Sequence, residues 1–201
     1  AVGPCGASSS KTCIWIGDVG DNAKSRTDLA LYAVDEPALD GKPFAKRTLA
    51  ARKYPFRYPD GNHDCETLLV HPASGEILVV TKDGATNARV YRFPQPLTPG
   101  VPVTLQAAGS AAGTAGKSIT GGDVSPCGDR VLLRAYFGLL EYAMAPGENA
   151  TTVATTLSVV PREVPMAFEL QSEAVAYRAD GLGYYTAPEG TGATLSFVGC
   201  K

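Results

Sequence analysis

Three acidic residues recur at similar intervals, each beside a short apolar run. They are Glu66, Asp123 and Glu173, and the intervals between them are 57 and 50 residues (123 − 66 and 173 − 123). A repeat of about 50 residues built from short strands is typical of a β-propeller, in which each repeat forms one blade around a central axis. The repeat therefore predicts that equivalent carboxylates converge on that axis.

Composition supports an all-β fold with a real core. The chain is 44% hydrophobic and 19% charged, and its 22 Gly and 15 Pro separate short segments rich in Val, Thr and Tyr. The net charge of −2 gives no basic surface for nucleic acid or an anionic membrane, and no apolar run approaches the roughly 20 residues of a membrane helix. We expect no nucleic-acid partner and no membrane partner.

The pattern predicts one domain over 1–201, made of four-stranded antiparallel blades. The blades fall at 1–57 (partial), 58–112, 113–168 and 169–201 (partial). Expected strands lie at 13–17 and 29–34; at 66–70, 76–81, 88–93 and 101–105; at 122–125, 130–136, 139–142 and 153–160; and at 173–177, 182–186 and 194–198. The loop 18–22 aligns with 82–84 and should lie at one rim of the hub. A small closed barrel or sandwich is the alternative.

Both ends of the chain are ragged on this alignment. Ala1–Pro4 matches Leu69–Pro72, so the first inner strand begins just after its acidic position, and the last blade stops after three strands. Propellers close a ring of about 4 to 8 blades. We therefore expect an incomplete propeller whose remaining blade or blades lie upstream, possibly in a separate polypeptide.

Five cysteines favour an oxidising, extracellular location. Cys5 and Cys13 enclose a short polar loop and are predicted to form a hairpin disulfide, the alternative being two unrelated thiols. Cys65, Cys127 and Cys200 cannot all pair within the chain. A targeting segment would already have been removed. Asn149-Ala150-Thr151 is a glycosylation sequon, a triplet that is common by chance.

The axial carboxylates are the first candidate for chemistry. Calcium takes 6 to 8 oxygen ligands, and one acid per blade would meet that need without a linear motif. The predicted metal ligands are Glu66, Asp123, Glu173 and Asp18. Alternatively, each acid caps an inner strand and bonds the next blade, and Lys82 or Arg134 supplies the compensating charge.

The loop 18–22 and His63 are the remaining candidates. The loop could bind a ligand or a metal, but it lacks the residue spacing of an EF-hand calcium loop. The alternative is a structural turn shaped by Gly20. His63 and Asp21 are the candidate catalytic residues of a metal-dependent hydrolase of lactone or phosphate esters, although His63 also suits an ordinary loop. His71 is assigned no role. No serine elbow or zinc motif is present.

Three functions remain open at this stage. The first is a secreted domain that binds a cation, calcium foremost, or a small ligand through the axial acids. The second is the metal-dependent hydrolase. The third is a protein- or glycan-binding module, which exposed aromatic patches at one rim would favour. Trp15, Tyr136, Tyr184 and Tyr185 fall within expected strands and are interpreted as interblade packing.

Several motifs resemble secreted bacterial β-propeller proteins, mostly of unassigned function and common in actinobacteria. The matching stretches are Trp15–Asn22, Tyr58–Gly61, Asp64–Glu66, Val80–Lys82, Thr120–Pro126 and Ser172–Ala174. In that family an acidic inner strand usually precedes the point where this chain begins, so the resemblance also implies truncation. The pattern is loosely similar to phytase-like and gluconolactonase-like propellers, which carry calcium on axial carboxylates. Their catalytic residues do not transfer.

Overall fold

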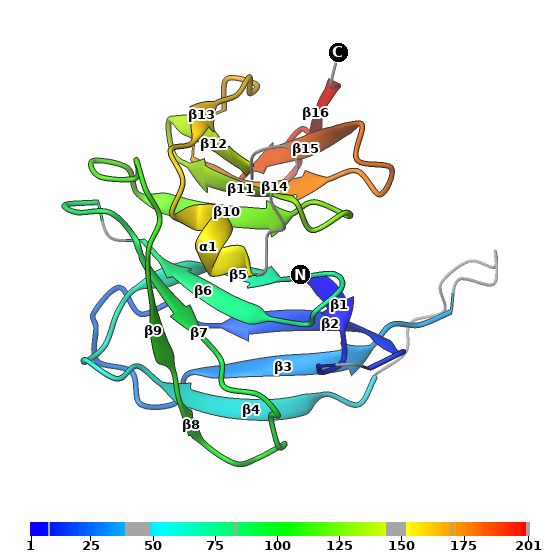
Figure 1. Ribbon diagram of the computed structural model, residues 1–201. Coiled ribbons are helices and arrows are strands. Elements are labelled where there is room, and N and C mark those ends of the chain that lie inside the picture. Colours follow the sequence, from blue (N-terminus) through cyan, green and yellow to red (C-terminus); the bar gives the residue numbers. More distant parts are fainter. Residues whose placement is uncertain (8, 39–48, 83, 144–151, 170, 200–201) are drawn as a thin grey trace.

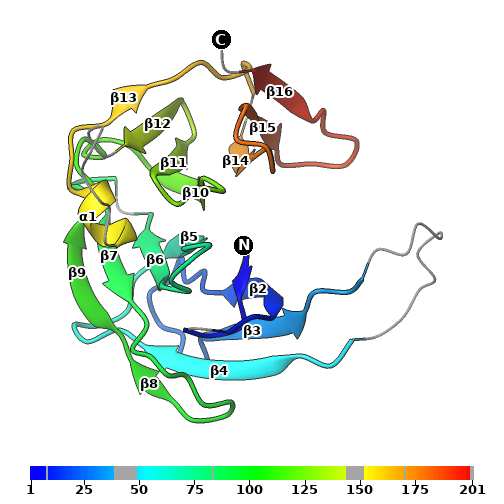
Figure 2. The ribbon, with the colours of Figure 1, turned by 45° about the vertical axis from the view of Figure 1, so that its right-hand side comes forward.

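The computed structural model describes residues 1–201 except 8, 39–48, 83, 144–151, 170 and 200–201. The sequon at 149–151 and Cys200 therefore lie outside the described residues. The described chain forms sixteen strands and one short helix, in four small sheets arranged as a propeller (Figure 1). Figure 2 shows the sheets following one another along an arc, with the N-terminus on its inner side. The predicted all-β propeller is confirmed.

In each sheet the first three strands are antiparallel and consecutive in the chain, and they follow one another outward from the hub. The first sheet contains β1 (Val2–Pro4), β2 (Thr12–Asp18), β3 (Ala30–Asp35), β4 (Arg52–Arg57) and β8 (Val103–Thr104). The second contains β5 (Cys65–Val70), β6 (Ile77–Thr81), β7 (Arg89–Arg92) and β9 (Gln106–Ser110). The third contains β10 (Ile119–Val124), β11 (Arg130–Ala135), β12 (Gly138–Ala143) and β13 (Arg162–Glu163). The fourth contains β14 (Ser172–Tyr177), β15 (Gly183–Pro188) and β16 (Ser196–Gly199).

The outer strand of the second sheet was predicted at 101–105, which is wrong. That segment crosses to the first sheet, where β8 pairs in parallel with β4, and Leu105 is buried among the first sheet's aromatic residues. The outer position is taken by β9, which pairs with β7. The sequence Gln106-Ala-Ala-Gly-Ser has little intrinsic strand preference, so pairing with β7, and not propensity, makes it a strand.

The expected strand at 153–160 is also wrong, because the helix α1 (Val153–Leu157) occupies it. The Thr152 side chain accepts a hydrogen bond from the Thr155 N–H, and the Glu76 carboxylate accepts one from the Val153 N–H at 2.7 Å. These two contacts satisfy donors that a helix start leaves unpaired. Val153 and Leu157 are buried, so tertiary contacts override the strand preference of the β-branched residues.

The core consists of three layers, each lying between two successive sheets. Trp15, Leu31 and Phe56 of the first sheet pack with Val79 and Phe93 from the second. The second layer joins the second and third sheets through Leu78, Val80, Val131, Leu133 and Tyr142. The third joins the third and fourth sheets through Leu132, Leu139, Val175, Tyr177 and Tyr184. Apolar burial between sheets therefore holds the arc together.

Two of the four aromatic residues interpreted as interblade packing lie in these layers. Trp15 and Tyr184 are 2% and 3% exposed. Tyr136 instead receives a hydrogen bond from Lys82, and Tyr185 is 36% exposed on the fourth sheet. Tyr136 thus makes an interblade contact, although through a hydrogen bond and outside the strand β11, which ends at Ala135. For Tyr185 the interpretation is wrong, since a strand position alone does not tell which face is covered.

Candidate functional site

A β-bulge in the inner strands of the last three sheets fixes which residues are equivalent. Each bulge leaves one residue unpaired against the second strand, and these residues are Glu66, Thr120 and Glu173. Their spacings are 54 and 53 residues (120 − 66 and 173 − 120), more regular than the spacings through Asp123. The expected equivalence of Asp123 is wrong, because it lies three positions further along β10, where the second sheet has Leu69.

Glu66 is held by a lysine that links the second and third sheets. Lys82 Nζ lies 2.7 Å from Glu66 Oε1 and donates to the Tyr136 hydroxyl at 2.8 Å. Burial lowers the pKa of Lys82, but the hydrogen bonds to Glu66 and Tyr136 outweigh it, so the pKa lies above its usual value. The other carboxylate oxygen, Glu66 Oε2, is buried and has no hydrogen-bond partner among the described residues.

Glu173 brings a second carboxylate from the fourth sheet into the field of Glu66. Its pKa is raised, first by burial and then by the negative charge of Glu66, while Lys82 acts in the opposite direction. Glu189 also raises it. A carboxylate with a raised pKa beside a like charge is stabilised by a proton or a cation. The charges of Glu66, Glu173 and Lys82 sum to −1 when all three are ionised.

The third bulge position carries no charge. The Thr120 hydroxyl donates to the Ser172 carbonyl at 2.7 Å, which ties the third sheet to the fourth. Within the described residues, Glu66, Asp123 and Glu173 do not form a group of three ligand atoms within 4.8 Å of one another. The hub therefore offers two acids for a cation, and not the predicted ring of three.

Asp123 has the structural role that the alternative reading predicts. Its Oδ2 accepts a hydrogen bond from the Tyr177 N–H of the next sheet at 2.8 Å. Burial raises its pKa, while the bonds from the Tyr177 and Val124 N–H groups and the charge of the chain's amino terminus lower it. Ala1 in turn donates to the Trp15 carbonyl at 3.0 Å. Asp123 thus joins two sheets near the N-terminus.

The loop 18–22 lies beside the hub, as its alignment with 82–84 predicts. Asn22 lines the same shallow hollow as Lys82 and Gly84, with a volume of about 200 Å³. Asp18 forms an ion pair with Arg26 at 2.7 Å, so an internal cation already neutralises this predicted metal ligand. No described contact brings Asp18 to Glu66.

Asp21 is a buried turn residue. Its carboxylate accepts hydrogen bonds from the Ser25 and Arg26 N–H groups, both at 2.9 Å, and from Asn62 Nδ2 at 3.2 Å. Desolvation acts to raise the pKa of Asp21, but these bonds outweigh it and hold the pKa below its usual value. The Asp21 N–H also donates to Asp64 Oδ1 at 2.8 Å. A fully engaged carboxylate of this kind shapes the loop and is a poor proton acceptor.

His63 lies in a buried polar cluster, 6% exposed, between the first two sheets. Its Nε2 is 3.0 Å from Asp60 Oδ1 and 2.9 Å from the Tyr91 hydroxyl, and its ring stacks on Tyr91. The pKa of Tyr91 is raised to about 12, first by burial and then by hydrogen bonding to Asp60. The geometry ties His63 to Asp60 and Tyr91 and does not link it to Glu66.

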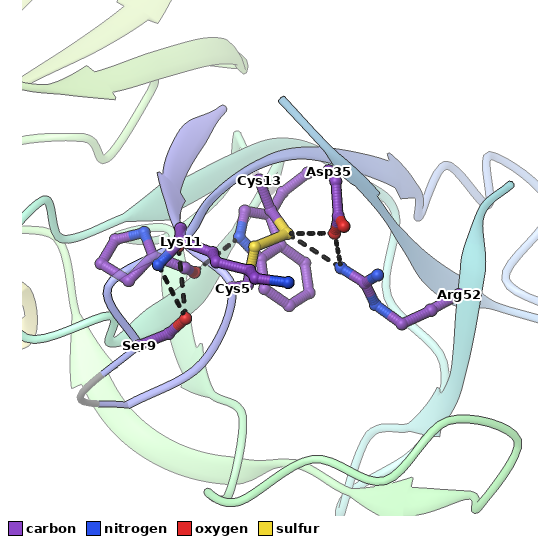
Figure 3. Close-up of a disulfide and its surroundings, with 8 residues drawn as sticks. Cys5, Ser9, Lys11, Cys13, Asp35 and Arg52 are labelled. Carbon is purple, nitrogen blue, oxygen red and sulfur yellow. Dashed lines mark hydrogen bonds and ion pairs between the residues drawn. A yellow bond between two sulfur atoms is a disulfide. The ribbon is translucent and has the colours of Figure 1, made fainter. Parts of the chain in front are cut away.

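The predicted disulfide is present between Cys5 and Cys13 (Figure 3). Cys13 Sγ lies 3.7 Å from Asp35 Oδ1 and 3.0 Å from Arg52 Nη2, and Arg52 pairs with Asp35 at 2.7 Å. Cys5, Cys13 and Asp35 bring three potential ligand atoms within 4.8 Å. Disulfide sulfurs are not thiolates, however, and Arg52 already supplies a cation, so this chemistry does not suit a metal.

The other described cysteines are free. Cys65, the first residue of β5, is fully buried, and burial raises its thiol pKa to about 12, so it behaves as an inert core residue. Cys127 is exposed in the turn between β10 and β11.

His71, which was assigned no role, is a turn residue. It accepts hydrogen bonds from the Ala73 and Ser74 N–H groups and shapes the turn between β5 and β6.

The buried Arg134, proposed from the sequence as a counter-charge for the axial acids, serves Glu169 instead. Its Nη2 lies 2.8 Å from Glu169 Oε2, and neither side chain is more than 5% exposed. Glu169 also accepts a hydrogen bond from Thr186 at 2.6 Å. Of the two suggested counter-charges, only Lys82 reaches an axial carboxylate.

Sequence reasoning missed two residues at the hub, Thr120 and Tyr136. The regular spacing of 54 and 53 residues would have identified Thr120, whereas the contact of Tyr136 with Lys82 leaves no pattern in the sequence.

Comparison with known proteins gives similarities in structure and none in sequence. No protein-family model and no curated protein matches the sequence. A crystal structure of a provisionally named 6-phosphogluconolactonase from Bacteroides uniformis aligns with 98% of this chain at 12% identity and a TM-score of 0.47. The chain spans about half of that protein, 52% of its length. A similarity this distant transfers no activity, and the assignment as a propeller rests on the four sheets themselves.

Proposed function

We propose that the hub binds a divalent cation, with calcium as the best fit, between Glu66 and Glu173. The main evidence is Glu66 Oε2, which is buried and has no hydrogen-bond partner among the described residues. A buried acceptor without a partner costs free energy that a ligand can recover. Glu173 adds a second carboxylate whose pKa is raised first by burial and then by the negative charge of Glu66.

Oxygen ligands favour a hard cation over a soft one. Calcium accepts carboxylates in irregular geometry together with water, whereas the group lacks the imidazole or thiolate ligands that zinc prefers. Two carboxylates leave most of the 6 to 8 coordination positions to water, so we expect weak binding, with Kd on the order of 10⁻⁴ to 10⁻³ M. That range suits the millimolar calcium of an extracellular protein, and the Cys5–Cys13 disulfide supports an extracellular location.

Calcium titration with thermal melting tests the proposal. At a calcium concentration ten times Kd, linkage predicts a gain of about 1.4 kcal/mol, and a chain of this size should melt roughly 3 to 6 °C higher. Chelator should reverse the shift. Glu66→Gln and Glu173→Gln should abolish it, while Glu163→Gln, an exposed residue paired with Lys117, should retain it. A calcium-independent melting temperature, or equal shifts in all variants, would overturn the proposal.

A small cationic ligand would meet the same two acceptors. A chelator removes calcium but does not affect an organic cation. An amine that raises the melting temperature in the presence of chelator, and only when Glu66 and Glu173 are intact, would therefore show that the hub binds a small cationic ligand.

The hydrolase and the interaction module stay predictions. Hydrolysis of lactone or phosphate esters required His63 and Asp21 beside the metal, and both are engaged in contacts of their own. The exposed aromatics Phe137 and Phe168, at 85% and 86%, are single residues in different segments. Neither observation favours a second function over cation binding. The resemblance to secreted bacterial propellers and the upstream location of further blades also stay predictions.

Among the described residues, no helix has the length and hydrophobicity that crossing a bilayer requires.

A further inference from the structure

The inner strands of the third and fourth sheets meet at the residue that carries the second hub acid. β10 and β14 lie side by side on the inner side of the arc (Figure 2). Thr120 on β10 and Glu173 on β14 are the residues that the bulges leave unpaired in these two strands. Two contacts of β10, one made by Thr120 and one by Gly121, fall on the peptide groups on either side of Glu173.

Thr120 contacts the peptide group that precedes Glu173. Its hydroxyl donates to the Ser172 carbonyl at 2.7 Å, and Thr120 and Ser172 are 4% and 0% exposed. This carbonyl belongs to the planar peptide that joins Ser172 to Glu173, so the bond fixes the orientation of that whole peptide. Breaking the bond would leave a buried polar group unpaired, which costs free energy and keeps the two strands in one geometry.

Gly121 contacts the peptide group that follows Glu173. A Cβ atom at Gly121 would lie 2.4 Å from the Glu173 carbonyl oxygen, well inside van der Waals contact. The backbones of β10 and β14 therefore approach each other at a distance that requires glycine. With Thr120 on one side and Gly121 on the other, the third sheet holds both peptides that set the direction of the Glu173 side chain.

The backbone that leads into Glu173 is held as well. Gln171 has a φ of 51°, a left-handed conformation that is uncommon for a residue other than glycine. Such a conformation costs free energy and persists where the surrounding structure enforces it. The Gln171 carbonyl accepts a hydrogen bond from the Glu189 N–H at 2.9 Å, and the Ser172 hydroxyl donates to the Glu169 carbonyl at 3.2 Å. These contacts hold the start of β14 in a strained conformation.

We propose that Thr120 is a positioning residue for the hub cation, which holds the Glu173 carboxylate where it can share a cation with Glu66. The inference rests on the proposed function and names the residue that orients one of its two ligands. Thr120 occupies the bulge position that carries an acid in the second and fourth sheets. The third sheet therefore contributes to the hub through the acid of the next sheet, and not through a carboxylate of its own.

Thermal melting across a calcium series tests this role, because it gives the melting temperature without calcium and the calcium Kd of each variant. Thr120→Val keeps the shape of the side chain and removes the hydroxyl. Its Kd should rise roughly tenfold, as is typical when a group that orients a metal ligand is lost. Its melting temperature without calcium should fall by roughly 2 to 6 °C for the lost hydrogen bond. Thr120→Ser restores the hydroxyl and should restore the Kd of the parent chain.

Thr156→Val is the matched control. Thr156 is 1% exposed in helix α1, and its hydroxyl donates to the Thr152 carbonyl at 3.3 Å. The substitution removes a buried hydroxyl contact from an element that carries no hub residue, so Kd should not change. Gly121→Ala is a second variant, which displaces the Glu173 backbone and keeps the Thr120 hydroxyl, and it should also raise Kd. Circular dichroism checks that each variant remains folded.

Two results would overturn this role and leave the hub proposal standing. One is a Thr120→Val chain that melts at a lower temperature and keeps the Kd of the parent, since the bond to Ser172 would then be structural only. The other is an equal rise of Kd in Thr120→Val and Thr156→Val, since Kd would then follow overall stability. A parent chain that does not respond to calcium would overturn the cation site itself, and the role of Thr120 with it.

Discussion

Lys82 Nζ lies 2.7 Å from Glu66 Oε1, and this ion pair joins the inner strand β5 of the second sheet to the residue that follows β6. The same ammonium donates to the Tyr136 hydroxyl at 2.8 Å and lies 4.9 Å from the centre of the Tyr136 ring. Lys82 thus neutralises one of the two hub acids and competes with any cation that binds there.

Lys82→Met should have opposite effects on stability and on calcium binding. Removing the ammonium leaves Glu66 partly buried without its partner, so the free energy of unfolding should fall by about 1 to 2 kcal/mol without calcium. The more negative hub should bind calcium more tightly, by roughly tenfold. Urea unfolding with and without calcium measures both effects. Lys117→Met, which breaks an exposed pair with Glu163, is the control. Unchanged calcium affinity in Lys82→Met would contradict the competition.

The Arg134–Glu169 pair should dominate the polar contribution between the third and fourth sheets. Arg134→Met leaves the Glu169 carboxylate buried with Thr186 as its remaining described partner, and such a loss typically costs about 3 to 5 kcal/mol. Glu169→Gln on the Arg134→Met background should recover part of that loss. A double-mutant cycle from urea unfolding gives the coupling energy. Additive effects of the two substitutions would show that the pair does not act as a unit.

The sequence predicted the blades well because their signal is local. Apolar runs separated by Gly and Pro turns mark β5, β6 and β14 directly, and pairing then follows from chain order. The predictions failed where tertiary contacts decide. Helix α1 depends on Glu76, which lies 77 residues away from Val153, and no periodicity reports such a contact.

The candidate site was predicted in part for a similar reason. Glu66 and Glu173 share a bulge position, and a bulge shifts the register by one residue without a mark in the sequence. The equivalent residue of the third sheet is Thr120, which is not acidic, so aligning acids by type selected Asp123, three positions further along β10. The pairing of Lys82 with Glu66 was available as an alternative, but the choice between Lys82 and Arg134 required three-dimensional proximity.

Asp123 should make stability fall as pH rises. Burial raises its pKa in the folded state above the usual 3.8, so the folded chain binds the proton more tightly than the unfolded chain. Stability is therefore greatest below pH 3.8 for this group, declines as pH rises through the raised pKa, and stays reduced above it. Asp123→Asn should remove that decline and raise the free energy of unfolding at pH 7 relative to the parent chain, because the asparagine amide carries no charge to bury.

Urea unfolding at a series of pH values measures the difference between Asp123→Asn and the parent chain. Asp28→Asn is a control of opposite sign, because hydrogen bonding to Arg26 lowers the pKa of Asp28. The stabilisation that Asp28 gives to the folded chain should be present above the usual Asp pKa, and it should be lost as pH falls through the lowered pKa of the folded state. A difference for Asp123→Asn that does not change with pH would show that burial does not control this carboxylate.

The Cys5–Cys13 disulfide should stabilise the first sheet by closing a short loop. The two residues are 8 positions apart, and the chain-entropy relation gives about 2 to 3 kcal/mol for a loop of that size. Cys5→Ser combined with Cys13→Ser should lower the melting temperature by roughly 4 to 12 °C, and reductant should lower the parent chain by a similar amount while leaving the double variant unchanged. Cys127→Ser, an exposed free thiol, should have no effect in either condition. A parent chain that melts at the same temperature with and without reductant would show that the contacts of Trp15 and Arg52 hold this hairpin without the covalent link.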